Sequence, residues 1–236
     1  MIESFALLPS ILLMLAALVP FIVVGVYARR ERYALARGWA AARGCTYMKS
    51  NPTMVLYLPG TPIVGPQSRV QDYIEGKTHG GRTFCSFKFF YQTSLIPGSS
   101  VAVGGTALMV RLPTALPRLS LSREEFSDGL DKIFGGQDIE LESEDFNRVY
   151  RVESPFEAFA YSVLHPRMME WMMSNGYGMV PFTIHDQDVI CWGGEEPDYE
   201  TLDKKLALMC EFIDLIPEHV LEQYQAPLAL DWTSHH

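Results

Sequence analysis

The sequence predicts an α+β fold, with an N-terminal transmembrane helix and a mainly antiparallel sheet that has helices on one face. An apolar stretch without a charged residue covers residues 5–27. After it, segments of alternating apolar and polar residues come in pairs before helical segments, so that a strand-strand-helix order occurs about three times, over 82–134, 139–174 and 180–216. Paired strands with short turns are typical of antiparallel sheets, and helices that follow them cover a sheet face.

The composition fits a folded chain with an uneven charge distribution. Among the 236 residues, 48% are hydrophobic and 20% are charged, and the net charge is −9. Residues 1–50 hold six basic and two acidic side chains, whereas residues 51–236 hold 13 basic and 26 acidic ones. An acidic body repels phosphate backbones, which argues against nucleic acid as a partner. The basic stretch beside the apolar one favours a membrane as a partner.

Residues 1–44 are predicted to form the transmembrane helix and a juxtamembrane helix. At about 1.5 Å per residue, residues 5–27 would span about 34 Å, against about 30 Å for the hydrocarbon core. Only Glu3 precedes the apolar stretch, which disfavours a cleaved signal peptide. Arg29, Arg30 and Arg32 follow it, so the positive-inside rule predicts a single-pass protein of the cell membrane with a cytoplasmic body.

The rest of the chain is divided into three parts. Residues 45–69, rich in Pro and Gly, are predicted to be a linker with one short strand at 54–57. The globular α+β domain is expected at 70–224, and residues 225–236 are expected to be a flexible tail.

Within the domain, the clearest strand is predicted at 82–93, because Cys85, Phe87, Phe89 and Tyr91 share one face at a period of two. Its partners are expected at 70–74, across a turn at 77–81, and at 101–112, where prolines end the strand. Further strands are predicted at 139–141, 147–152, 180–185 and 189–192, and helices at 122–134, 155–164, 167–174, 200–216 and 218–224. Ser122 with Glu125 is a capping box for the first of these helices.

Residues with catalytic or metal-binding chemistry are dispersed. Asp186-Gln187-Asp188 follows His185, and two carboxylates beside an imidazole can hold a divalent metal, but Asp-rich segments between strands are more simply tight turns. No motif for a nucleophile, a zinc site or a phosphate loop is present in the sequence, so neither a metal nor a cofactor is predicted. An enzyme would need a dispersed site, with His79, Asp186 and Asp188 as first candidates.

One short helix is crowded with large apolar residues. Methionine side chains adapt to varied surfaces, so such a helix can bind a protein partner, and it can equally pack on the sheet. Five such residues on two turns cannot all face one side, which leaves a surplus for binding. The candidate binding residues are Met168, Met169, Trp171, Met172 and Met173.

Residues 81–91, 116–121, 139–152 and 156–173 resemble a group of uncharacterised bacterial proteins, in which a membrane helix precedes a domain of unknown function. The resemblance implies a bacterial source, an actinobacterial one in view of the Ala- and Arg-rich segment, and it implies no activity. The predicted function is therefore that of a membrane-anchored, non-catalytic binding or scaffolding module. The alternatives are an enzyme with the dispersed site and an exported, tethered domain.

Overall fold

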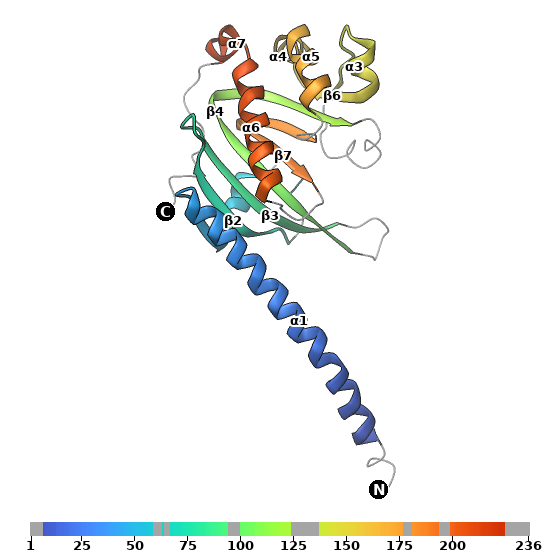
Figure 1. Cartoon of the computed structure of the whole chain (residues 1–236). Helices are drawn as coiled ribbons and strands as arrows, with labels where there is room; N and C mark the ends of the chain where they lie inside the picture. The colour runs from blue at the N-terminus through green and yellow to red at the C-terminus, as the bar shows by residue number, and fades with distance from the viewer. Residues whose placement is uncertain are drawn as a thin grey trace.

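The computed structural model describes residues 7–58, 63, 67–93, 100–123, 137–176, 181–193 and 199–224. A long helix extends from a body that is built around one sheet (Figure 1). The elements are α1 (Leu7–Ala42), β1 (Thr46–Ser50), the 3₁₀ helix η2 (Pro52–Tyr57), β2 (Arg69–Lys77), β3 (Thr83–Thr93), β4 (Val101–Arg123), β5 (Gln137–Asp138), α3 (Glu144–Val149), β6 (Tyr150–Ser154), α4 (Glu157–Val163), α5 (Pro166–Asn175), β7 (Phe182–Gly193), α6 (Tyr199–Leu215) and α7 (Glu218–Gln223).

The sheet is antiparallel and follows the order β1-β2-β3-β4-β6-β5, with β7 also paired to β4. The 23-residue strand β4 is its spine. β3 pairs with the first half of β4, β6 pairs with its end, and β7 runs along both halves. The α+β class and the mainly antiparallel sheet are thus confirmed.

Both faces of the sheet are buried at its centre. Cys85, Phe87 and Phe89 of β3 face a smaller core that is covered by Met54 of η2. Phe84 belongs to the main core on the other face. Within the described residues, the buried side chains of the α-helices all belong to this main core. These helices therefore lie on one face of the sheet.

The predicted transmembrane helix is wrong. In the described part of the chain, no helix combines the length and the apolar character needed to cross a membrane. Helix α1 instead continues past Arg32, and its last turns pack on the body through Ala36, Trp39 and Ala40. The single-pass anchor and the cell-membrane localisation that rested on this helix are therefore wrong too.

The segment 45–69, expected to be a linker, contributes to the sheet and to the core. Strand β1 pairs with β2, and Met54, Leu58 and Ile63 are buried in the smaller core. The strand expected at 54–57 is the 3₁₀ helix η2, because the Asn51 side chain accepts a hydrogen bond from the Met54 amide and Pro52 occupies the first turn.

Over the residues that the structure describes, the predicted strand-strand-helix repeat is not observed. Strand β4 continues through Pro113 and Pro117 to Arg123, so Ser122 lies in a strand; the rest of the helix expected at 122–134 lies outside the described residues. The β4–β7 register is irregular between Arg111 and Leu119, and irregularities of this kind are where a strand accommodates a proline. The expected tail at 225–236 also lies outside the described residues.

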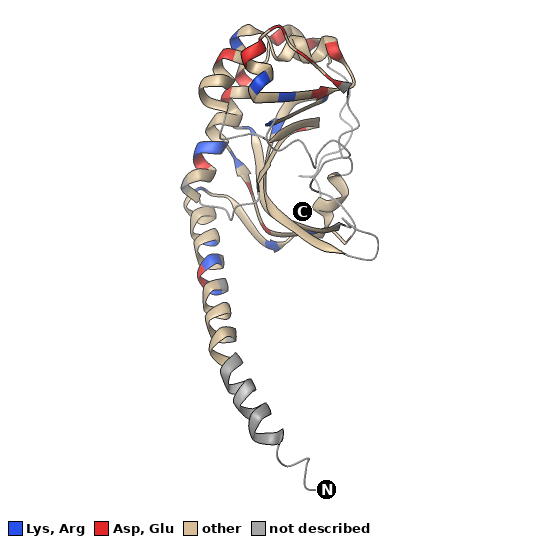
Figure 2. Cartoon of the chain, turned by 90° about the vertical axis from the view of Figure 1, so that its right-hand side faces the viewer, with Lys and Arg blue, Asp and Glu red and all other residues tan. Residues whose placement is uncertain are grey.

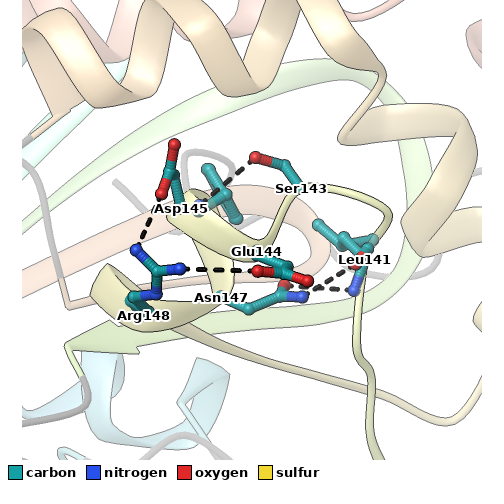
Figure 3. A network of polar contacts seen from close by, with 7 residues as sticks. Leu141, Ser143, Glu144, Asp145, Asn147 and Arg148 are labelled. Atoms are coloured by element: carbon teal, nitrogen blue, oxygen red, sulfur yellow. Dashed lines mark hydrogen bonds and ion pairs between the residues drawn. The ribbon is translucent and has the colours of Figure 1, made fainter.

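Two further segments differ from their predicted elements. Residues 147–149 belong to α3 and not to a strand, because the Ser143 side chain caps this helix and the Asn147 amide bonds both backbone groups of Leu141 (Figure 3). The hairpin expected around Asp186 is a single strand, β7. Asp186 has a φ of 56° at the irregular register and therefore kinks the strand without reversing it.

Candidate functional site

A cavity with several charged and polar side chains in its lining lies where α1 meets the sheet, and we call it the basic cavity. Its volume is about 820 Å³. Its cations come from three elements: Arg32 from α1, Lys49 from β1 and Lys88 from β3. Figure 2 shows Lys and Arg residues along the part of α1 that approaches the body. The remaining lining residues are Tyr33, Ser50, Gln71, Asp72, Phe90, Ala102, Val103, Gly104, Gly105 and Thr106.

A bulge in β2 shapes the floor of this cavity. The β2–β3 register shifts between Gln71 and Ile74, and Asp72 has a left-handed φ of 49° there. Its carboxylate accepts a hydrogen bond of 2.9 Å from the Tyr47 hydroxyl and lies 3.4 Å from the Lys88 ammonium. Burial, together with this hydrogen bond and the charge of Asp72, raises the pKa of Tyr47, so the hydroxyl remains a proton donor.

The rim of the cavity combines cations with aromatic rings. The Lys49 ammonium lies 5.7 Å from the centroid of the Tyr33 ring, within the range of a cation–π interaction. Phe90 is 39% exposed and offers an apolar wall. The three cations and the single carboxylate, Asp72, give the lining residues a charge of +2 in a chain of net charge −9.

A second cavity of about 790 Å³ lies between the end of α1, the β2–β3 hairpin and α6. Two ion pairs belong to its lining. The Arg43 guanidinium donates two hydrogen bonds to the Asp203 carboxylate, one from Nε and one from a terminal nitrogen. It also lies 4.4 Å from the centroid of the Trp39 ring. The Arg82 guanidinium lies 2.6 Å from the Asp214 carboxylate. We call this second cavity the clamp cavity, because these contacts join α1 and the hairpin to α6.

The structure does not bring the candidate catalytic residues into one site. His79 is exposed in the hairpin and lines the clamp cavity, whose lining includes neither Asp186 nor Asp188. Asp188 is buried in β7 and pairs with Arg111 at 3.4 Å. Among the residues that the structure describes, no three His, Cys, Asp or Glu side chains are grouped so that they could hold a metal ion.

The Met-rich helix α5 is largely part of the core. Met168, Met169 and Met172 are buried, and the Trp171 indole donates a hydrogen bond of 3.3 Å to Glu211. Met173 is 45% exposed. The five candidate residues therefore do not form one exposed binding surface, because three of them are buried in the core.

Sequence reasoning missed the basic cavity altogether. Arg32, Lys49 and Lys88 are far apart in the sequence and belong to no motif, and only the pairing of β1, β2 and β3 beside α1 brings them together. The nearest signal was the basic excess of residues 1–50, which contain two of the three cations.

Comparison with known proteins gives one structural likeness. No family model matches the chain, and no curated protein matches it. The crystal structure of the mycobacterial trehalose monomycolate transport factor A, TtfA, is similar to it over 83% of this chain and 96% of that chain, with a TM-score of 0.56 and 13% sequence identity. At this identity, the likeness shows that the two proteins share a fold.

Proposed function

We propose that this chain is a non-catalytic accessory protein that acts in a transport process by binding a protein partner. The fold that it shares with a transport factor supports the class of function. The observation that carries the proposal is an apolar stretch of α1, residues 19–27, which extends away from the body (Figure 1). We call it the projecting segment.

The projecting segment exposes large apolar side chains. Phe21 is 76% exposed, Val24 is 67% exposed and Tyr27 is 64% exposed, and Val19, Val23 and Val26 are also exposed. Contiguous apolar surface of this kind marks an interaction site. Burying a side chain such as Phe or Val contributes roughly 1.5–3 kcal/mol, so a groove that covers three of them supplies a large share of a stable association.

Photo-cross-linking in cells of the source organism tests the proposal. A benzophenone amino acid replaces Val24 in the full chain, and the matched control carries it at Leu56, which is 71% exposed on η2. Position 24 should give one protein adduct of defined mass that position 56 does not give. Phe21→Ser should reduce the yield of that adduct severalfold. No protein adduct at position 24, or adducts with lipid alone, would overturn the proposal.

A further inference from the structure

We propose that the basic cavity binds an organic phosphate, a ligand with a phosphate group at its cations and an apolar group on its aromatic wall. This ligand site is separate from the projecting segment and does not depend on the proposed partner. The cavity volume of about 820 Å³ lies within the range of ligand pockets, roughly 300–1,000 Å³.

The positive charge of the cavity lining favours an anionic group on the ligand. The lining residues carry +2, and a phosphate monoester carries roughly −1.5 to −2 at neutral pH. Arg32 supplies a planar fork of donors, while Lys49 and Lys88 supply compact ammonium groups from two strands. The cavity lining is therefore opposite in sign to the chain as a whole, whose net charge is −9.

Two of the three cations already have partners within the protein. Lys88 is 14% exposed and is fixed by Asp72, whose other carboxylate oxygen is held by the Tyr47 hydroxyl. Lys49 is held over the ring of Tyr33. Side chains that are already ordered lose little conformational entropy on binding, so the affinity for a phosphate rises.

The apolar part of the cavity wall favours an apolar group on the ligand. The rings of Phe90 and Tyr33 and the side chain of Val103 line the same cavity as the cations. Gly104 leaves room beside this wall, since a Cβ atom there would lie 2.7 Å from the Phe90 ring. A larger residue at position 104 would therefore displace Phe90 and fill the apolar side of the cavity.

Isothermal titration calorimetry of the full chain tests this inference with three probes: inorganic phosphate, dihexanoyl phosphatidic acid below its micelle concentration, and dihexanoyl phosphatidylcholine. We expect phosphatidic acid to bind with a stoichiometry of one, at least tenfold more tightly than inorganic phosphate and than phosphatidylcholine. Raising the salt concentration from 50 to 300 mM should weaken this binding severalfold.

Variants separate the two halves of the site. Arg32→Gln with Lys49→Gln should weaken phosphatidic acid at least tenfold, and Gly104→Val should weaken it severalfold while leaving inorganic phosphate unchanged. The charge-matched control, Arg148→Gln with Arg167→Gln, alters residues outside the cavity and should leave the Kd within twofold. Thermal unfolding of each variant verifies that it is folded.

Three results would overturn the inference. The first is that neither inorganic phosphate nor phosphatidic acid shows saturable binding. The second is equal weakening by the control pair, which would mean that only the overall charge matters. The third is equal affinity for inorganic phosphate and phosphatidic acid, which would remove the apolar half of the proposed ligand and leave free phosphate as the source of the anion.

Discussion

Asp72 and Lys88 form an ion pair of 3.4 Å, in which the two side chains are only 12% and 14% exposed. The pair connects the bulge of β2 to the neighbouring strand β3, and the Tyr47 hydroxyl from β1 donates to the same carboxylate. Three adjacent strands are therefore linked through one side chain. Their relative position sets where the Lys88 ammonium lies in the basic cavity.

Replacing Asp72 by Asn should lower the free energy of unfolding by about 2 kcal/mol, because Lys88 would stay poorly solvated without its counter-charge. Asn tolerates the left-handed backbone at this position, so the change removes the charge with little added strain. Urea unfolding at pH 7 measures the effect. Asp145→Asn is the control: this carboxylate is 78% exposed beside Arg148, and its loss should cost about 0.5 kcal/mol or less. Equal midpoints for the two variants would contradict the importance of the buried pair.

Replacing Gly105 by Ala should destabilise the sheet between β4 and β7. A Cβ atom at this position would lie 2.2 Å from the Gly193 carbonyl oxygen and 2.9 Å from the Phe89 ring, so the backbone has to move. We expect a loss of about 2 kcal/mol, in the range of overpacked cores. Gly193→Ala is the matched control, since an added Cβ there meets nothing within 4 Å. Comparable thermal unfolding temperatures for the two variants would show that the close approach is absent.

The four cysteines should separate into two classes of reactivity. All four are free; Cys85 and Cys191 are buried, whereas Cys45 and Cys210 line the clamp cavity. Burial raises the pKa of all four thiols, to about 11 for Cys191 and well above the usual value for Cys85, and these two are also closed off from solvent. Labelling with a disulfide reagent at pH 8 should therefore modify two thiols in the native protein and four in denaturant. The variant with Cys45→Ser and Cys210→Ser should lose the native labelling, and rapid labelling of that variant would refute the assignment.

Stability should fall as the pH drops below about 6.5. Burial, with a smaller contribution from Arg118, lowers the pKa of His185, while Asp186 opposes the shift. As the pH falls, the His185 imidazole therefore binds a proton in the unfolded chain before it does so in the folded chain. Its contribution to the free energy of unfolding is complete above the pKa that it has in the unfolded chain, and is lost as the pH falls below that pKa. His185→Gln should lessen the loss of unfolding free energy between pH 7.5 and 5.5. His79→Gln, at an exposed position, should retain the wild-type slope, and identical slopes for all three proteins would contradict this role of His185.

Local patterns in the sequence were sufficient to predict the centre of the fold. The alternation of Cys85, Phe87 and Phe89 identified β3 and the face that these residues share, because each strand of a layered sheet places successive side chains on opposite sides. The turn before β3 was also predicted correctly, and Gly81 has a φ of 80° there. These features depend on neighbours in the chain, which a single sequence displays.

Features that depend on distant partners were missed. Pro113 and Pro117 are local signals for the end of a strand, yet pairing with β7 and β6 carries β4 on to Arg123. The basic cavity has the same origin, since its cations meet only after the strands have paired. Likewise, the composition of residues 5–27 favoured a transmembrane helix, but α1 continues into a charged stretch whose end packs on the body.

Helix α5 shows how burial divides a Met-rich sequence, and it gives the last prediction. Met172 is completely buried in the main core, whereas its neighbour Met173 is 45% exposed. Met172→Ala should lower the free energy of unfolding by about 2–4 kcal/mol through loss of packing and the cavity it leaves. Met173→Ala should change it by about 0.5 kcal/mol or less.

Urea unfolding, monitored by circular dichroism, measures the free energy of unfolding of both variants. The two substitutions remove the same atoms from adjacent positions on one helix, so their difference isolates the effect of burial from that of helix propensity. If Met173→Ala were the more destabilising change, the side of α5 that carries Met173 would face the core, and the assignment of Met172 to the core would be wrong.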